Sequence, residues 1–575
     1  MKLTGAELFV KALKEEQVEF LFAYPGGQAI DLFNALYGEP DIKVILPRHE
    51  QGLIHAADGY ARSTGKVGVC LVTSGPGATN LVTGIATANY DSVPMVCFTG
   101  QVPTGLIGND AFQEVDIVGI TRSITKYAVT VRDREALGET IKKAFYIARS
   151  GKPGVVVVDL PKDIQQETGS DHYPAEISIR GYKPRVSVHG GQIKKAWDIL
   201  QSAKKPLLLT GGGVMISHAQ EELTRFVDMT GIPVITTIMG KGAIASNHKL
   251  YGGNIGIHGS YAANSAVNSC DVLLSIGTRF NDRITGRLET FAPHAVVIHI
   301  DIDPASISRN IDVDVPIVAD AKTAITALLE KAAPLNIEEW QTNIEIWKQK
   351  YPIQMKHPGM TPQVIIQHIN EAFAEAVITT DVGQNQLWAT QFLELHARKQ
   401  LLTSGGLGTM GYGLPAAIGA SLGNPDRPVI VIAGDGGIQM NIQELATAVV
   451  QELPIIICIL NNGYLGNVRQ WQEMFFDRRY VSTCTRYRKG CSAACNTPDQ
   501  NCPEFVPDFV MLAESYGAKG IRVQNISEID PALTMAKENQ KTPTLIEFLI
   551  DREINVLPIV QPGQSLNTMI GMEAE

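Results

Sequence analysis

Residues 427–468 read RPVIVIAGDGGIQMNIQELATAVVQELPIIICILNNGYLGNV and contain the clearest fold signal in the chain. Two β-branched apolar runs, 429–433 and 455–460, flank a helix-length amphipathic segment, which predicts a parallel strand–helix–strand unit. Asp435 follows the first run in a Gly-Asp-Gly turn, and Asn462 follows the second run. Such units bind ligands beyond the carboxyl ends of their strands. We therefore expect both side chains at one edge of the sheet, where carboxylate and amide oxygens suit Mg²⁺.

Asp-Gly and Asn-Gly pairs are also ordinary turn formers, so either pair alone would be weak evidence. Their combination is more specific. The Gly-Asp-Gly turn followed by Asn461-Asn462 resembles the thiamine diphosphate signature of pyruvate decarboxylases, pyruvate oxidases and acetolactate synthases. The resemblance implies that thiamine diphosphate and Mg²⁺ bind here, with Asp435, Asn462 and Tyr464 at the metal.

The composition indicates a large globular protein. A chain of 575 residues is too long for one hydrophobic core. Its net charge of −10, without a basic block, argues against nucleic acid or an anionic membrane as a partner. No apolar run approaches the ~20 residues of a membrane span, and the acidic amphipathic start is unlike a secretory signal. We expect a cytoplasmic protein that binds neither nucleic acid nor membranes.

Alternating helix and strand patterns predict the α/β class, with three doubly wound domains and mainly parallel sheets. The first and third domains are expected to be related by duplication, because Gly75-Pro76-Gly77 aligns with residues 434–436 in similar surroundings. A polar linker is expected at 165–190. The predicted units are an N-terminal pyrimidine-binding domain (1–180), a central FAD-binding domain (190–345), a C-terminal diphosphate- and Mg²⁺-binding domain (360–552) and a tail (553–575).

The first copy of the repeat supplies a different acid. Glu50, in Arg-His-Glu-Gln at 48–51, stands at an expected helix start, where the helix dipole alone favours a carboxylate. In thiamine diphosphate proteins, a carboxylate on the aminopyrimidine promotes the imino tautomer that removes the C2 proton of the cofactor. The Tyr-Pro-Gly-Gly turn at 24–27 followed by 48–51 resembles the acid-bearing half of this superfamily. Glu50 is therefore the expected cofactor activator.

The glycine-rich stretch 405–411 contains a formal G-x-G-x-x-G. Alone it would suggest an NAD fold, but no ribose-binding acid is clearly placed around it. By resemblance, its glycines admit the backbone to the pyrimidine, and Met410 props the two cofactor rings into their bent shape; ordinary core packing is the alternative for Met410. Besides Glu50 and Met410, the implied contacts of thiamine diphosphate are Gly27, Val382, Gly383, Gln384, Gly408, Gly436 and Gly437.

Further motifs narrow the resemblance to one family. FAYPGG, RHEQ, TSGPGATN, DAFQE, LPKD, GTRFNDR, HIDIDP, SGGLGTMGYGLPAAIGA, GDGGIQMNIQEL and NNGYLGNVRQWQ together resemble the catalytic large subunit of acetohydroxyacid synthase, or acetolactate synthase. These enzymes decarboxylate pyruvate and transfer the hydroxyethyl unit to pyruvate or 2-ketobutyrate, giving 2-acetolactate or 2-aceto-2-hydroxybutyrate for branched-chain amino acid biosynthesis. The resemblance also implies a homodimer or homotetramer and a small regulatory subunit.

The same family binds FAD in its middle domain, although its reaction has no net redox step. A glycine-rich turn after a strand is a sensible dinucleotide contact. Residues that match the FAD-contacting positions are Lys152, Gly211, Gly212, Gly213, His258, Gly259, Gly277, Arg279, Asp301, Ile302, Asp320 and Ala321.

The resemblance also implies which residues bind the substrates. Arg279 and Trp471 match the pair that grips the second keto acid, with the guanidinium on the carboxylate and the indole on the alkyl end. Gln113 and Lys162 match positions that line the reaction space. Gln113 would donate to the developing oxyanion, whereas Lys162 could equally be a solvated lysine. With the activating acid and Met410, these residues form the expected catalytic set.

Three residues depart from the family pattern. Gln28 follows the Pro-Gly-Gly turn in place of a small residue, Asn281 replaces the first Asp of Arg-Phe-Asp-Asp-Arg, and Asn385 replaces a His. The alternatives are a pyruvate oxidase that uses FAD and thiamine diphosphate, which lacks the Arg-Gln-Trp-Gln tryptophan, and a catabolic acetolactate synthase, which usually lacks Arg-Phe-x-Asp-Arg. A non-catalytic binding or sensor protein of the same fold would not need the activating acid and metal ligands.

Four cysteines crowd into residues 480–504, whereas the other four lie in or beside apolar strand-like runs. Their C-x6-C-x3-C-x6-C spacing departs from the usual zinc knuckle. A zinc ion or iron–sulfur cluster, disulfides and reduced thiols all remain open for Cys484, Cys491, Cys495 and Cys502.

Overall fold

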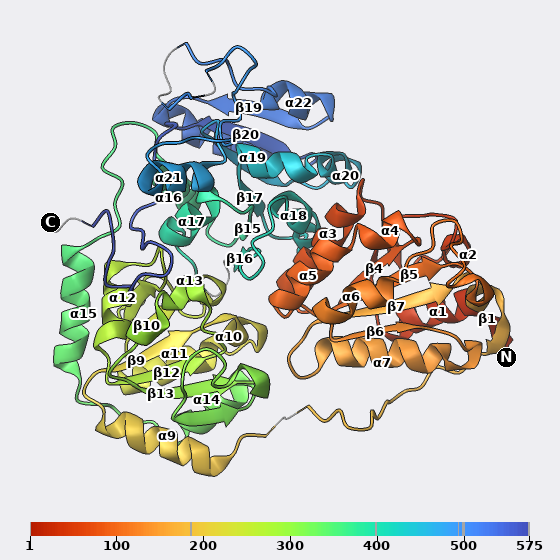
Figure 1. Ribbon diagram of the computed structural model, residues 1–575, viewed down its shortest axis with the longest axis horizontal. Helices are drawn as coiled ribbons and strands as arrows, with labels where there is room; N and C mark the ends of the chain where they lie inside the picture. The colour runs from red at the N-terminus through yellow and green to blue at the C-terminus, as the bar shows by residue number, and fades with distance from the viewer. Residues whose placement is uncertain (1, 185–186, 397–399, 493, 497–500, 573–575) are drawn as a thin grey trace.

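The computed structural model describes residues 2–572 except 185–186, 397–399, 493 and 497–500. Three six-stranded sheets, each flanked by helices, form three lobes (Figure 1). All strand pairs in these sheets are parallel. This confirms the expected class of three doubly wound α/β domains, while their exact bounds stay a prediction. No described helix is both long and apolar enough to cross a bilayer.

The N-terminal sheet has the order β3-β2-β4-β5-β7-β6. Its inner strands are buried along their whole length, because helices cover both faces. The strands are β2 Phe20–Ala23, β3 Lys43–Ile45, β4 Gly68–Val72, β5 Met95–Gln101, β6 Tyr127–Thr130 and β7 Val155–Pro161, and the main helices are α1 Gly5–Glu15, α3 Glu50–Thr64, α5 Val82–Tyr90 and α7 Leu137–Arg149.

The C-terminal sheet, β16-β15-β17-β18-β20-β19, repeats that order strand for strand along the chain. The shared topology confirms the expected duplication. Its strands are β15 Val377–Thr380, β16 Gln400–Leu402, β17 Val429–Gly434, β18 Ile456–Asn461, β19 Lys519–Val523 and β20 Thr544–Leu549, and its helices include α17 Gln384–Phe392, α18 Gly413–Gly423, α19 Asp435–Ile438, α20 Glu444–Val450 and α21 Gly466–Phe475.

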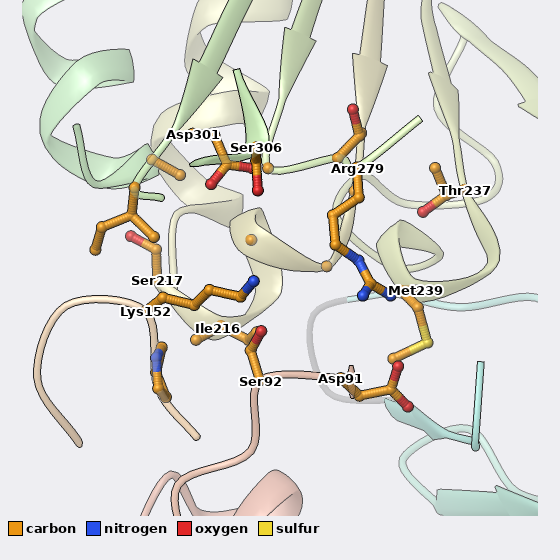
Figure 2. A pocket seen from close by; sticks show the side chains of 18 of the residues that line it. Asp91, Ser92, Lys152, Ile216, Ser217, Thr237, Met239, Arg279, Asp301 and Ser306 are labelled. Carbon is orange, nitrogen blue, oxygen red and sulfur yellow. The ribbon is translucent and has the colours of Figure 1, made fainter. Parts of the chain in front are cut away.

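The central sheet has the order β11-β10-β9-β12-β13-β14, typical of dinucleotide-binding folds. The order of strand addition reverses between β9 and β12, and Lys152, Arg279 and Asp301 face one cavity beyond this point (Figure 2). The strands are β9 Pro206–Thr210, β10 Val234–Thr236, β11 Tyr251–Asn254, β12 Val272–Ile276, β13 Val296–Asp301 and β14 Val315–Val318, and the helices include α10 Gly212–Ile216, α13 Asp282–Thr285 and α14 Ala321–Leu329.

The linker and the tail are more ordered than their polar composition predicts. Within 165–190, β8 (Thr168–Ser170) pairs antiparallel with β1 (Lys2–Thr4). The Arg134 guanidinium beside this pair donates to the carbonyls of Leu3 and Thr4. In the tail, Val560 and Leu566 are buried in the core of the central domain. Both segments are therefore held by contacts with residues distant in sequence.

Helices α3 and α18 join the N-terminal and C-terminal domains through backbone contact. A Cβ at Gly59 would lie 2.1 Å from the Ala416 carbonyl oxygen, and one at Gly419 would lie 1.8 Å from the Ala56 oxygen. No real side chain fits at these distances, so glycine is required at both crossing points. The two domains are consequently fixed to each other through main chain.

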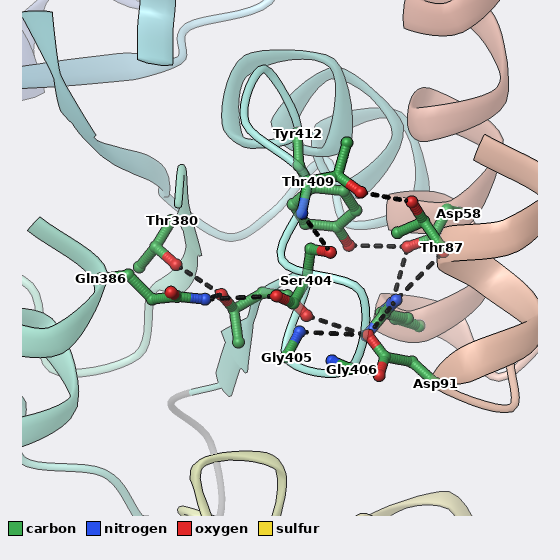
Figure 3. Close-up of polar contacts among 12 residues, drawn as sticks. Asp58, Thr87, Asp91, Thr380, Gln386, Ser404, Gly405, Gly406, Thr409 and Tyr412 are labelled. Atoms are coloured by element: carbon green, nitrogen blue, oxygen red, sulfur yellow. Dashed lines mark hydrogen bonds and ion pairs between the residues drawn. The ribbon is translucent and has the colours of Figure 1, made fainter. Parts of the chain in front are cut away.

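A buried ion-pair network extends this junction (Figure 3). Arg62 on α3 binds Asp58 at 2.6 Å and Asp91 at 3.1 Å, and its side chain is only 9% exposed. The Tyr412 hydroxyl donates to Asp58 at 2.6 Å. Asp91 in turn accepts the backbone N–H groups of the glycine-rich loop at Gly405 and Gly406, at 3.2 and 2.9 Å. The network therefore holds that loop against the N-terminal domain.

Removing the central cation should show how much this network contributes. Arg62→Ala leaves two carboxylates buried without their partner, which typically costs about 3–5 kcal/mol. Lys66→Ala is the matched control, because Lys66 pairs with Glu19 at the surface, where ion pairs contribute little. Urea denaturation should give a much lower unfolding midpoint for Arg62→Ala than for Lys66→Ala. Equal midpoints would contradict a stabilising role for the network.

Candidate functional site

A cavity of about 60 Å³ lies at the carboxyl ends of β17 and β18. Asp435 directly follows β17 and Asn462 directly follows β18; the two residues are 1% and 6% exposed. Predicted cofactor and metal residues from four separate chain segments converge on this cavity. The lining includes Val382, Gly383, Gln384, Met410, Gly436, Gly437 and Tyr464 as well as Asp435 and Asn462.

The environment of Asp435 suits a cation. Burial raises the pKa of its carboxyl to about 7, although the Thr485 hydroxyl donates to Oδ2 at 3.0 Å. The Asn462 amide donates to Gln384 and its Oδ1 accepts from the Tyr464 N–H, so its orientation is fixed. One carboxylate and one amide oxygen in a small cavity are typical of Mg²⁺, which takes its other oxygens from phosphate and water.

Asp381 is a site residue that sequence analysis missed. It is 1% exposed and accepts from the backbone N–H groups of Val382, Gly411 and Gly413 at 2.8, 3.0 and 3.2 Å. Burial raises its pKa to about 6, and these backbone bonds oppose the rise. A Cβ at Gly437 would lie 2.2 Å from its carboxylate. Asp381 thus connects the turns around the cavity. Its position directly after the end of β15 was the sequence signal that could have identified it.

The predicted N-terminal residues lie at the carboxyl edge of their own sheet. Glu50 begins α3, and its Oε2 accepts from Asn80 Nδ2 at 3.0 Å. Lys162 follows β7 and donates to the Gly27 carbonyl at 3.0 Å. Gln113, with a left-handed φ of 60°, lies against the Gly75 turn. Glu50 does not contribute to the Asp435 cavity of its own chain.

Glu444 links this edge to the C-terminal domain and was also missed. It is fully buried on α20 and accepts the backbone N–H groups of Arg48 and His49, each at 3.0 Å. These residues immediately precede Glu50, so Glu444 fixes the start of α3. Nothing local in the sequence distinguishes Glu444 from an ordinary helix glutamate, since its partners are some 400 positions away.

The central cavity has a volume of about 300 Å³ (Figure 2). Of the predicted FAD residues, all line it except His258 and Gly259. His258 instead lies near the Pro558 carbonyl, 3.0 Å away, in a separate cavity with Lys241. The residues that the structure brings together at the central cavity are Lys152, Gly211, Gly212, Gly213, Gly277, Arg279, Asp301, Ile302, Asp320 and Ala321.

The glycine turns of this cavity touch each other. A Cβ at Gly211 would lie 2.2 Å from the Gly277 oxygen, and one at Gly277 would lie 2.6 Å from Gly213. Around them, Lys152 pairs with Asp303 at 3.1 Å, while burial raises the pKa of Asp301 to about 6. The arrangement offers closely packed glycine backbone without side chains, a cation and acids, which suits the phosphates and ribose of a dinucleotide.

Of the three departures from the family pattern, only Asn385 has a structural explanation. Asn281 Oδ1 is buried beside the central cavity, and among the described residues it has no hydrogen-bond partner. Asn385 donates to the Asp381 and Ile432 carbonyls at 2.8 and 2.9 Å and so joins the ends of β15 and β17. The Gln28 N–H donates to Thr73 at 3.2 Å.

The predicted acceptor residues are not paired as expected. Arg279 lies over the Tyr90 ring, 5.8 Å from its centroid, and lines the central cavity. The guanidinium over the Trp471 ring, also at 5.8 Å, belongs to Arg283 on α13. The sequence Arg-Phe-Asn-Asp-Arg contains both arginines. Only the direction of each side chain in the structure shows which of them lies over Trp471.

The described part of the cysteine-rich segment shows no metal cluster. Across the part of the chain that the structure describes, no three His, Cys, Asp or Glu residues gather to hold a metal ion. Residues 493 and 497–500 of this segment lie outside the described part. The structure therefore gives no support to a zinc or iron–sulfur site at Cys484, Cys491, Cys495 and Cys502.

Comparison with known proteins agrees with this geometry. Three family profiles match, described as the N-terminal TPP binding domain (residues 3–120), central domain (193–328) and C-terminal TPP binding domain (381–548) of thiamine pyrophosphate enzymes. Similar proteins include the probable acetolactate synthase large subunit of Methanococcus aeolicus, 45% identical over 99% of this chain and 95% of its own.

Two further relatives are the large subunit of Corynebacterium glutamicum acetolactate synthase (44% identical; 98% and 89% covered) and that of Escherichia coli isozyme 3 (41%; 99% and 98%). Identity at this level extends over nearly the whole length of both partners in each comparison. The chain therefore belongs to the acetolactate synthase large subunits of the thiamine pyrophosphate-dependent enzymes.

Proposed function

We propose that this chain is the catalytic subunit of an acetohydroxyacid synthase. It decarboxylates pyruvate and transfers the two-carbon unit to a second pyruvate or to 2-ketobutyrate. The convergence of Asp435, Asn462 and the glycine turns on one cavity carries this proposal, because these are the groups that a metal-bound diphosphate requires.

The C-terminal residues hold the cofactor. Asp435 Oδ, Asn462 Oδ1 and Tyr464 would coordinate Mg²⁺, while the backbone around Gly436 and Gly437 approaches the diphosphate closely because no Cβ intervenes. When bound, thiamine diphosphate supplies the carbon nucleophile that attacks the keto group and the electron sink that allows CO₂ to leave.

Glu50 supplies the acid–base step. Its carboxylate, held by Asn80, would bond the aminopyrimidine and hold the proton that tautomerisation requires. Because Glu50 lies outside the cavity of its own chain, we infer a homodimer in which it serves the cavity of the second chain. Gln113 and Lys162 lie at the same N-terminal edge and would face the substrate oxygens.

The acceptor keto acid would bind between Arg283 and Trp471. The guanidinium suits the carboxylate common to both acceptors, and the indole contacts the alkyl end that distinguishes them. FAD fits the central cavity through the touching glycine turns, Lys152 and the unpartnered Asn281 oxygen, and would have a structural role. The relatives are named large subunits, so a small regulatory subunit is an expected partner.

One assay tests the proposed activity. Purified protein should be supplied with pyruvate, thiamine diphosphate, Mg²⁺ and FAD, with and without 2-ketobutyrate. We expect acetolactate alone in the first case and additional acetohydroxybutyrate in the second. Flavin reduction with acetate formation would instead identify a pyruvate oxidase.

Glu50→Gln should lower turnover by about two orders of magnitude or more, because the amide cannot exchange the proton. Thiamine diphosphate binding, measured by equilibrium dialysis, should stay largely intact. Glu19→Gln is the control, since Glu19 pairs with Lys66 and Tyr60 at the surface, outside both candidate cavities. Near-normal turnover of Glu50→Gln would refute the assignment.

Mg²⁺ affinity should depend on pH through Asp435. Above its pKa of about 7 the carboxyl is ionised and binds the metal directly; below it, Mg²⁺ must displace a proton, so affinity falls with decreasing pH. Thr485→Val removes the hydrogen bond that opposes the pKa rise, and should move the midpoint of this fall to higher pH. Calorimetric Mg²⁺ titrations across neutral pH would measure the affinity profiles of the wild type and of Thr485→Val. A wild-type affinity that does not change with pH would disprove the role of Asp435 ionisation.

Acceptor choice should depend on Trp471. One extra methylene is worth about 1–3 kcal/mol in an apolar pocket, so Trp471→Leu should reduce the preference for 2-ketobutyrate while acetolactate still forms. Arg283→Lys should raise KM for both acceptors, because both carry the carboxylate. Arg279→Lys is the matched comparison and should change FAD retention instead. If Arg279→Lys raised the acceptor KM and Arg283→Lys did not, the assignment of Arg283 as the acceptor-binding arginine over Trp471 would be wrong.

A further inference from the structure

The start of the cysteine-rich segment is hydrogen-bonded to the candidate metal site. Tyr464 and Cys484 form an antiparallel bridge, in which the Leu465 N–H donates to the Thr483 carbonyl at 2.8 Å. The Thr485 N–H donates to the Gly463 carbonyl at 3.1 Å, and its hydroxyl reaches Asp435. Residues 483–485 are therefore attached directly to the metal turn at 462–465.

The base of the segment is closed by arginines. Arg486 donates through Nε to the Pro503 carbonyl and through Nη2 to the Cys502 carbonyl. Arg488 Nη2 donates to the Glu504 carbonyl at 3.0 Å. These bonds bring the two ends of the segment side by side, so Cys484 and Cys502 lie near its base although 17 residues separate them in sequence.

Arg552 contacts both of these cysteines. Its Nη2 lies 3.8 Å from Cys484 Sγ, and its guanidinium also hydrogen-bonds the Cys502 side chain. The same guanidinium lies over the Tyr464 ring, 4.9 Å from its centroid. A single side chain therefore connects the two sulfur groups with the metal turn.

The two thiols differ from the cysteines of the core. Cys70, Cys97 and Cys458 lie on central strands and are 0% exposed, so no reagent reaches them in the folded protein. Cys484 and Cys502 are partly exposed. A small oxidant therefore has access to this pair and not to the core cysteines.

We propose that Cys484 and Cys502 are a redox-active pair whose disulfide locks residues 483–485 against the metal turn. The oxidant is a low-molecular-weight disulfide such as oxidised glutathione. The first thiolate attacks it, forms a mixed disulfide and releases one glutathione; the second thiolate attacks the mixed disulfide and releases the other. The protein loses two electrons and two protons, and both protons are recovered on the two glutathione thiols.

The disulfide replaces the contacts of Arg552 with Cys484 and Cys502 by a direct covalent bond between the two cysteines. It holds the two ends of the segment together covalently, so the end that carries Thr485 moves less and separates from Asp435 less readily. This inference rests on the proposed function. The lock predicts slower loss of Mg²⁺ and thiamine diphosphate from the oxidised protein than from the reduced protein. Thiol state would then control how long the cofactor stays bound.

The test uses the full-length wild type, Cys484→Ser and, as a matched control, Cys495→Ser in the same segment. Each protein is equilibrated in oxidised or reduced glutathione, and disulfides are mapped by non-reducing peptide mass spectrometry. A Cys484–Cys502 peptide should appear in the oxidised wild type and in Cys495→Ser. Release of thiamine diphosphate after EDTA addition, followed by rapid filtration, should be severalfold slower in those two oxidised proteins than in their reduced forms. Cys484→Ser should show one rate under both conditions.

A different pairing, or thiols that stay reduced in oxidised glutathione, would overturn the redox pair. A mapped Cys484–Cys502 disulfide with an unchanged release rate would overturn the lock. If the reduced wild type bound no thiamine diphosphate, the proposed function would be wrong. The disulfide map would still show whether Cys484 and Cys502 form a redox pair.

Discussion

Arg62 is the residue on which the junction of the N-terminal and C-terminal domains depends. Its guanidinium neutralises two buried carboxylates, Asp58 and Asp91, and Asp91 binds the backbone of the glycine-rich loop. Two buried acids cannot stay ionised at neutral pH without such a cation. Because α3 and α18 also touch through main chain, the N-terminal domain and this loop form one rigid junction.

The junction between the N-terminal and C-terminal domains places the glycine-rich loop 405–411 between the two candidate cofactor sites. Its first residue, Gly405, and Asp91 line the central cavity, whereas Met410 near its end lines the Asp435 cavity. Asp381 holds the far end of the loop through the N–H groups of Gly411 and Gly413. If FAD occupies the central cavity as proposed, it would support the same loop that approaches thiamine diphosphate and so have a structural role.

Sequence patterns predicted the features that depend on local periodicity. Strand ends placed Asp435 and Asn462 correctly, because two neighbouring parallel strands must end at one edge. Residues whose role depends on distant partners could not be found this way: Glu444 binds backbone near residue 48, and Thr485 reaches Asp435 across 50 positions. Arg279 and Arg283 are four residues apart, and their sequence motif does not encode which one faces Trp471.

In the proposed homodimer, the acid and the metal of one active site come from different chains. Mixing Glu50→Gln with Asp435→Ala chains tests this sharing, because in a mixed dimer one site has both groups intact and the other has neither. Random mixing should restore about a quarter of wild-type activity from two inactive parents. Mixed dimers demonstrated by mass spectrometry, yet as inactive as either parent, would contradict a shared site.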